Sequence, residues 1–120
     1  AHVWLVPNPE HNPLGDFGLA ESAPGSGTGR AVNLPPADAA RDLRPRFTYS
    51  TIALLKAELF AAPWCDIAPG NPHGQAAPLA PLLRQAMDAG RCGATLYTGR
   101  WTDVGTPQRL AQLNAAPTFL

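Results

Sequence analysis

Residues 79–97 read LAPLLRQAMDAGRCGATLY, and this stretch predicts a helix followed by a strand. Pro81 fits only in the first turn of a helix over Leu79–Ala89, and Gly90 is a typical residue for its end. A strand centred on Thr95–Tyr97 follows. The apolar residues of the helix recur at i, i+3, i+4, i+7 and i+8 and form one stripe: Leu79, Leu82, Leu83, Ala86 and Met87.

Strands dominate the sequence before this helix. His2–Val6, HVWLV, is a short apolar run rich in β-forming residues and predicts a buried strand. Phe17–Glu21 predicts a second strand, which turns at the glycine-rich stretch Ala23–Gly29 and returns over Ala31–Leu34 as a hairpin. Phe47–Leu54, FTYSTIAL, alternates aromatic and β-branched residues with hydroxyls, which indicates a strand buried on one face.

Helical segments complete the pattern. Lys56–Ala61 predicts a short helix, and the proline- and glycine-rich stretch Trp64–Ala77 predicts a loop. The last helix begins at Thr106–Pro107, where a hydroxyl N-cap precedes a proline, and we expect Leu110 and Leu113 on its inner face. The order of strands, helix, strand and helix predicts an α/β fold with a mixed sheet and flanking helices.

The composition narrows the classes of function. The chain has 120 residues, with nine basic and nine acidic side chains, so we expect neither a nucleic-acid nor a membrane partner. Cys65 and Cys92 show no metal-ligand spacing; a disulfide stays open, but two isolated thiols favour a reduced, cytoplasmic protein. The sequence enters directly in a strand at His2, without an initiator methionine, which indicates a part of a longer protein.

The segment Gly99–Pro107, GRWTDVGTP, carries the clearest chemical signal. A carboxylate, Asp103, follows an aromatic residue at the end of the predicted strand, and a glycine and a helix-capping threonine come next. Carboxylates at strand ends can hold a divalent cation beside phosphates, because Mg²⁺ prefers oxygen ligands. The alternative is that Asp103 only supports the turn and Thr106 only caps the helix.

Four segments, in this order, give the chain a family resemblance. Residues 5–17 are LVPNPEHNPLGDF, which is similar to the pattern LVxNPxHxxGDF, residues 47–52 are FTYSTI, residues 81–87 are PLLRQAM, and residues 101–106 are WTDVGT. Together they resemble the bacterial sugar-1-phosphate nucleotidyltransferases. The nearest subgroup is the N-acetylmuramate-1-phosphate uridylyltransferases of cell-wall peptidoglycan recycling; sequences described as mannose-1-phosphate guanylyltransferase-like are similar too.

The resemblance implies a doubly wound, Rossmann-like α/β domain, of which residues 1–120 are the C-terminal half. The family's nucleotide-binding half, with its glycine-rich loop, is absent from this sequence. Asp103 matches the second Mg²⁺-binding aspartate of the family. The implied reaction transfers a nucleotidyl group, uridylyl above all, from a nucleoside triphosphate to a sugar 1-phosphate and releases pyrophosphate. We expect the isolated chain to be inactive and to self-associate through uncovered strand edges.

On the sugar side, each candidate residue also has a structural interpretation. Asn8 binds a sugar hydroxyl or only shapes the turn between two prolines, and Asp16 recognises hydroxyls or fixes its loop. His11 contacts the substrate or is merely solvated. Thr48 and Ser50 lie two residues apart and therefore share one face of their strand, which lines a sugar pocket or is an ordinary half-buried face.

Two positions depart from the family pattern. Thr51 stands where the family has glycine, and Pro78 stands where close relatives carry lysine. These departures motivate a second hypothesis, in which the protein is a non-catalytic sugar-phosphate binding or assembly module.

Overall fold

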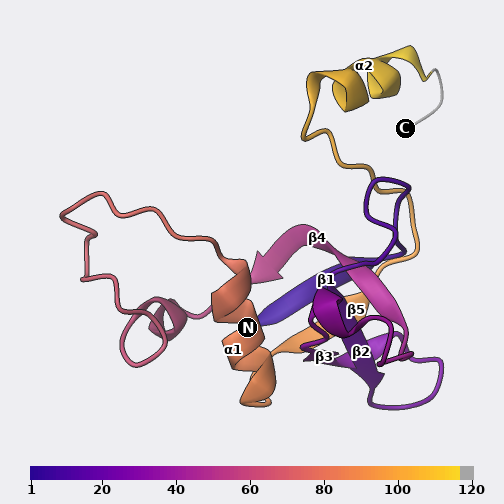
Figure 1. The fold of residues 1–120 in the computed structure, drawn as a ribbon. Coiled ribbons are helices and arrows are strands. Elements are labelled where there is room, and N and C mark those ends of the chain that lie inside the picture. The colour runs from indigo at the N-terminus through magenta and orange to yellow at the C-terminus, as the bar shows by residue number, and fades with distance from the viewer. Residues whose placement is uncertain (117–120) are drawn as a thin grey trace.

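The computed structural model describes residues 1–116, and in it five short strands close into a small barrel (Figure 1). The order around the barrel is β1-β4-β2-β3-β5, and β5 pairs again with β1. The β1–β5 pair is parallel, and the other four pairs are antiparallel. The predicted mixed sheet is therefore confirmed. The strands are β1 (His2–Val6), β2 (Phe17–Glu21), β3 (Thr28–Val32), β4 (Arg46–Leu54) and β5 (Gly93–Leu96).

The hairpin of β2 and β3 is tighter than the sequence indicated. The strand β3 begins at Thr28 rather than at the predicted Ala31, and Gly29 pairs with Glu21 within the ladder. A Cβ at Gly29 would collide with the carbonyl oxygen of Ala20. Gly29 therefore allows the backbones of β2 and β3 to approach closely inside the sheet, although the glycine-rich stretch that contains it predicted a turn.

The hydrophobic core fills the barrel and the interface with α1 (Ala80–Asp88). Leu83, Ala86 and Met87 are the buried residues of α1, and they lie on the predicted stripe. The helix packs beside β3 near the start of the chain (Figure 1). The buried core residues are Val3, Leu5, Phe17, Ala31, Leu59, Leu83, Ala86, Met87, Cys92 and Ala94.

The end of α1 is set by Gly90, as predicted. Its φ of 71° is in the left-handed region that glycine adopts without strain. The amide of Gly90 donates to the carbonyl of Met87 at 2.9 Å, and the amide of Arg91 donates to the carbonyl of Ala86 at 2.8 Å. This pair of bonds is a Schellman motif, which satisfies the last carbonyls of the helix and turns the chain toward β5.

The helix α2 (Pro107–Ala115) begins as predicted but does not join the core. The hydroxyl of Thr106 accepts a hydrogen bond from the amide of Arg109 at 3.1 Å, which confirms the N-cap. None of the described residues of α2 is buried, and Leu110 is 46% exposed. The expected inner position is thus wrong for Leu110, whereas Leu113 is half-buried. The helix α2 lies apart from the barrel at the end of the 97–106 connection (Figure 1).

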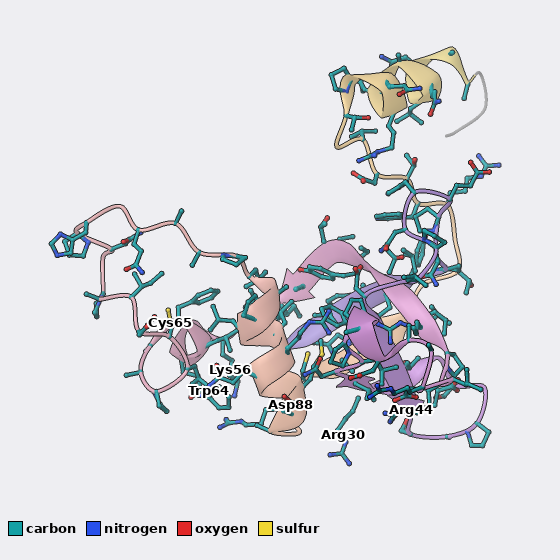
Figure 2. The ribbon with its side chains drawn as sticks, in the orientation of Figure 1. Arg30, Arg44, Lys56, Trp64, Cys65 and Asp88 are labelled. Carbon is teal, nitrogen blue, oxygen red and sulfur yellow. The ribbon has the colours of Figure 1, made fainter. Side chains whose placement is uncertain are left out.

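Two 3₁₀ turns and a long loop complete the fold. They are η1 (Pro36–Asp38) and η2 (Ala57–Phe60), the latter where a short helix was predicted. The segment from Trp64 to Ala77 is a loop, as predicted, and it projects away from the barrel (Figure 1). Cys65 lies next to Trp64 on this segment (Figure 2), whereas Cys92 is buried, and both thiols are free. No helix among residues 1–116 is long and apolar enough to span a bilayer.

A β-bulge in β4 holds Thr51, the residue that departs from the family pattern, in a conformation that favours glycine. The pairing of β1 with β4 shifts between Val3 and Leu5, so Trp4 faces the extra residues of the bulge. Thr51 has a φ of 68° there, a conformation that strains a β-branched residue. The family's glycine adopts this conformation freely, so Thr51 carries a backbone strain that glycine would not.

Replacing Thr51 with glycine is therefore expected to raise the free energy of unfolding by about 1 kcal/mol, because the left-handed strain is relieved. Urea unfolding followed by circular dichroism measures the change. Thr98→Gly is the matched control: Thr98 has no positive φ, so added chain entropy should make that variant less stable. A Thr51→Gly protein that is less stable than the original would contradict the strain at this bulge.

Closure of the barrel concerns two predictions, self-association through strand edges and a doubly wound sheet. Each of the five described strands pairs on both sides, so no strand of residues 1–116 has an edge that is unpaired along its whole length, although β2 pairs with β4 only at Phe17 and Gly18. Self-association itself stays a prediction. The doubly wound arrangement also stays a prediction about a larger domain, because only β1 and β5 run parallel here.

Candidate functional site: a carboxylate and an aromatic pocket that share Trp101

The loop between β1 and β2, residues 7–16, is held against β4 by a polar network. The side-chain amide of Asn12 donates to Asp16 Oδ2 at 3.2 Å and to Thr48 Oγ1 at 3.1 Å. The Thr48 hydroxyl donates to Asn8 Oδ1 at 2.9 Å, and the amide of Tyr49 donates to Asp16 Oδ2 at 2.8 Å. Three of the predicted sugar-side residues are thus brought together around an asparagine that the sequence reasoning missed.

A glycine and an arginine hold this loop from the other sides. Gly15 has a φ of 69°, and a Cβ there would lie 2.6 Å from Asn8 Oδ1 and 2.9 Å from the backbone of Phe47. Arg84 of α1 donates to the carbonyl of Asp16 at 3.2 Å, and its guanidinium lies 4.8 Å from the ring centre of Phe17. Burial lowers the pKa of Arg84, and the nearby charge of Asp16 partly opposes this effect. The loop is therefore fixed to both β4 and α1.

Ser50 sits apart from that network, at the bulge. It is 2% exposed and lies on the same buried face as Thr48, as the strand spacing predicted. Its hydroxyl donates to the carbonyl of Trp4 at 2.7 Å and accepts from the amide of Ile52 at 3.2 Å. Ser50 therefore satisfies backbone groups that the bulge removes from the ladder.

Replacing Ser50 with alanine is expected to cost about 1–3 kcal/mol of stability, because buried backbone groups lose their partner. Thermal unfolding would measure the loss. Ser26→Ala is the control: its hydroxyl also bonds backbone groups, of Thr28, but in the exposed hairpin turn, where water can replace it. This change should alter stability by less than about 0.5 kcal/mol. Equal stability of the Ser50 variant and the original chain would show that the bulge does not depend on this hydroxyl.

Asp103 lies where the 97–106 connection meets the loop 7–16. Its Oδ1 accepts a hydrogen bond from the amide of Gly105 at 2.8 Å. Its Oδ2 accepts from Arg109 at 2.8 Å and lies 3.2 Å from Nε2 of His11. The Asp103 side chain is 34% exposed, so it also borders solvent. The interpretation of His11 as a merely solvated loop residue is wrong, because the network around Asn12 presents its loop to Asp103.

Two depressions meet at Trp101. The first is polar and surrounds Asp103; it is lined by Pro9, Glu10, His11, Trp101, Thr102, Asp103, Arg109, Gln112, Leu113 and Ala116. The second is mainly apolar and is lined by Trp4, Val6, Ser50, Ile52, Tyr97, Arg100 and Trp101. We call their combined lining the Trp101 surface. An apolar, aromatic pocket with a few polar groups at its margin is the usual form of a small-molecule site.

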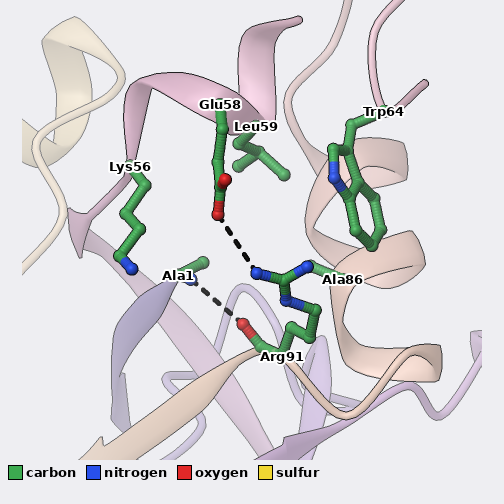
Figure 3. A pocket seen from close by; sticks show the side chains of 7 residues that line it. All are labelled: Ala1, Lys56, Glu58, Leu59, Trp64, Ala86 and Arg91. Carbon is green, nitrogen blue, oxygen red and sulfur yellow. Dashed lines mark hydrogen bonds and ion pairs between the residues drawn. The ribbon is translucent and has the colours of Figure 1, made fainter. Parts of the chain in front are cut away.

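A further pocket lies between η2, α1 and the first residue, and contacts within the chain join the residues that line it (Figure 3). Arg91 reaches across to Glu58 at 3.1 Å, and its guanidinium lies 5.7 Å from the ring centre of Trp64. The carbonyl of Arg91 also accepts a hydrogen bond from the amino group of Ala1 at 3.0 Å. These contacts give the pocket a structural role.

The residues around Asp103 can be compared with the ligands that a magnesium ion requires. Residues 1–116 contain no group of three or more His, Cys, Asp or Glu side chains that could hold a metal ion. Mg²⁺, however, often binds one or two carboxylates and takes its remaining ligands from water and substrate phosphates. Asp103 supplies at most one ligand to such an ion, and both of its oxygens already accept hydrogen bonds from this chain. The described residues therefore do not fit a metal held by this chain alone.

The structure places all five candidate site residues that the sequence indicated, and it adds three others. Asn8, Asp16 and Thr48 cluster, Ser50 borders the apolar pocket, and Asp103 lies in the polar depression. Arg109, Asn12 and Tyr97 were missed. A basic residue in the first turn of α2, six positions after Asp103, was the one available signal for Arg109.

The fold and the Trp101 surface together define an α/β protein with an apolar pocket beside a carboxylate. No model of a known protein family matches the chain. The chain is 37% identical over 115 residues to the N-acetylmuramate alpha-1-phosphate uridylyltransferase of Neisseria meningitidis serogroup B. The match covers 96% of this chain and 41% of that relative. It confirms the resemblance to the sugar-1-phosphate nucleotidyltransferases, of which this chain spans less than half the length.

Proposed function

We propose that this chain forms the sugar-phosphate side of a sugar-1-phosphate uridylyltransferase. The observation that carries the proposal is the Trp101 surface, where an aromatic pocket and a carboxylate adjoin through one side chain. A sugar 1-phosphate has a ring to place in such a pocket and a phosphate to place beside a cation. The name of the Neisseria relative supports a uridylyl donor and an N-acetylmuramate acceptor.

The apolar pocket suits the ring of the acceptor. Trp4, Tyr97 and Trp101 offer aromatic surface for the ring's C–H groups, and Arg100 lies at the margin of the pocket. The phosphate would face Asp103 across Trp101. Asn8, Asp16 and Thr48 would act on this side indirectly, by shaping the loop 7–16 and β4, because they do not line the Trp101 surface. Ser50 borders the apolar pocket, with its hydroxyl engaged by the backbone of the bulge.

The proposed reaction joins the acceptor to a nucleotide. A phosphate oxygen of the sugar 1-phosphate attacks the α-phosphorus of UTP, a new O–P bond forms, and the bond to the β-phosphate breaks to release pyrophosphate. Asp103 would hold Mg²⁺, which when bound neutralises charge on the phosphates. The chain's own contribution is to place the acceptor in line, and no covalent intermediate with the protein is required.

The rest of the site would come from residues outside this chain. We infer that the nucleotide is held by an N-terminal segment and that the two parts together form a doubly wound domain. The relative is more than twice as long as the matched region, which supports this inference. A bacterial, cytoplasmic role in peptidoglycan recycling is part of the proposal. The two free cysteines are compatible with a reducing compartment.

Pyrophosphate release by the natural protein that contains this sequence tests the proposal. With UTP, Mg²⁺ and N-acetylmuramate 1-phosphate, we expect release that depends on all three, and none from the 120-residue chain alone. If the protein binds the sugar phosphate but releases pyrophosphate with none of the nucleoside triphosphates, the result would instead support the non-catalytic binding module. The engagement of both Asp103 oxygens by protein donors is the observation that favours that second function.

A further inference from the structure

The apolar pocket of the Trp101 surface has aromatic walls that neighbouring residues support. Trp4 lies opposite Thr95 in the pairing of β1 with β5. The ring of His2 meets the ring of Trp4 edge-on, with the two ring centres 4.8 Å apart. Nε2 of His2 and the hydroxyl of Thr95 share a hydrogen bond of 2.8 Å, which holds the imidazole from its other side. Trp4 is therefore a supported wall of the pocket.

Tyr97 forms another wall, and Gly99 makes room for it. The amide of Tyr97 donates to the carbonyl of Leu5 at 2.8 Å, which ties this residue to β1. A Cβ at position 99 would collide with the hydroxyl end of the Tyr97 ring. Gly99 does not have a positive φ, so the backbone conformation does not require glycine here. The missing side chain is what lets the tyrosine ring lie over this part of the chain.

Tyr97 also brings a hydroxyl to a pocket whose other hydroxyl is in use. The Ser50 hydroxyl donates to the carbonyl of Trp4 and accepts from the amide of Ile52. The Tyr97 hydroxyl makes no hydrogen bond with the residues that the structure describes, and Tyr97 is 46% exposed. A phenol can both donate and accept, whereas the indole and guanidinium groups of the other lining residues only donate. The Tyr97 hydroxyl is therefore the group best suited to a directed hydrogen bond with a ligand.

A mainly apolar lining with one available hydroxyl suits a particular kind of substituent. Ile52 is 55% exposed and lines the pocket together with Val6, so the pocket offers aliphatic contact beside the tyrosine. A sugar that carries only hydroxyls would leave most of them without partners in such a pocket, which weakens binding. An acylamino substituent combines a methyl group with one carbonyl oxygen, and it matches both the aliphatic side chains and the hydroxyl.

We propose that Tyr97 is a specificity residue of the acceptor site: its hydroxyl donates a hydrogen bond to the carbonyl oxygen of an acylamino group on the sugar, and the acyl methyl group packs against Ile52. This inference rests on the proposed function, because it takes the apolar pocket as the site of the acceptor. Gly99 is then a positioning residue, which acts through the tyrosine ring. The site accordingly selects acylamino sugar 1-phosphates over sugar 1-phosphates that carry only hydroxyls.

Two ligands that differ in one substituent test the proposal, N-acetylglucosamine 1-phosphate and glucose 1-phosphate. Calorimetric titration of the natural protein that contains this sequence measures both dissociation constants. We expect the original protein to bind the acetylated ligand about tenfold more tightly. Tyr97→Phe should weaken binding of the acetylated ligand about fivefold and leave that of glucose 1-phosphate within about twofold, because one hydrogen bond is lost. Gly99→Ala, which displaces the ring but keeps the hydroxyl, should act in the same direction.

Tyr49→Phe is the matched control, because Tyr49 is the chain's other tyrosine and its side chain packs against the core outside the Trp101 surface. It should leave both dissociation constants unchanged, and circular dichroism should show that all three variants are folded. An original protein that binds both ligands equally, or a Tyr97→Phe protein that keeps the full preference, overturns this proposal but leaves the acceptor site in place. If neither ligand nor N-acetylmuramate 1-phosphate binds, the proposed function fails and this inference fails with it.

Discussion

Replacing Phe17 with alanine is expected to lower the free energy of unfolding by about 3–5 kcal/mol, or to leave the chain unfolded. Phe17 is 2% exposed, its ring centre lies 6.1 Å from that of Tyr49, and the Arg84 guanidinium covers it at 4.8 Å. Truncation removes the buried ring and leaves a cavity where β2, β4 and α1 meet. It also leaves the guanidinium without its aromatic partner.

Urea unfolding measures this loss, with Phe60→Ala as the matched control. Phe60 is 46% exposed on η2, so the same truncation there should cost far less. A cost below about 1 kcal/mol at Phe17 would mean that the core is not centred where β2 meets β4 and α1.

The second large effect concerns activity. In the natural protein that contains this sequence, Asp103→Asn should reduce the rate of pyrophosphate release on the order of a hundredfold or more. The amide keeps the size of the side chain and removes the negative charge that would hold Mg²⁺ and that now pairs with Arg109. Steady-state assays at saturating UTP and Mg²⁺ measure the change in kcat.

Asp66→Asn serves as the control for this experiment. Asp66 is an exposed carboxylate in the segment after η2, outside the Trp101 surface. Its variant should retain full activity, and circular dichroism should show that both variants are folded. An Asp103→Asn protein with unchanged kcat would remove the magnesium role from this residue.

Local features of the fold were predictable because they depend on neighbouring residues. The apolar stripe and Gly90 gave α1 to within a residue at each end, and Thr106 with Pro107 gave the start of α2. The closure of the barrel was not predictable, because β1 pairs with β4 and β5, which lie far along the chain. The position of α2 was not predictable either, because Arg109 and Leu113 of this helix face a depression that the distant loop 7–16 helps to form.

The candidate site shows the same division. Motif positions pointed to Asp103, Asp16 and Asn8 as important residues. Their partners Arg109, Asn12 and His11 could not be assigned, because each pairing depends on how a loop returns to a distant segment. The strain at Thr51 was also hidden, since threonine in a β-rich stretch predicts an ordinary strand residue, whereas here it occupies a bulge.

Titration of the labelled chain with N-acetylmuramate 1-phosphate tests the central claim, that the Trp101 surface holds the sugar phosphate. The indole N–H signal of each tryptophan reports on a different place: Trp101 joins the two depressions, Trp4 borders the apolar one, and Trp64 lies in the separate pocket of Figure 3. The account predicts saturable shifts for Trp101 and Trp4 and none for Trp64. Unmoved signals at Trp101 and Trp4, or a shift confined to Trp64, would contradict it.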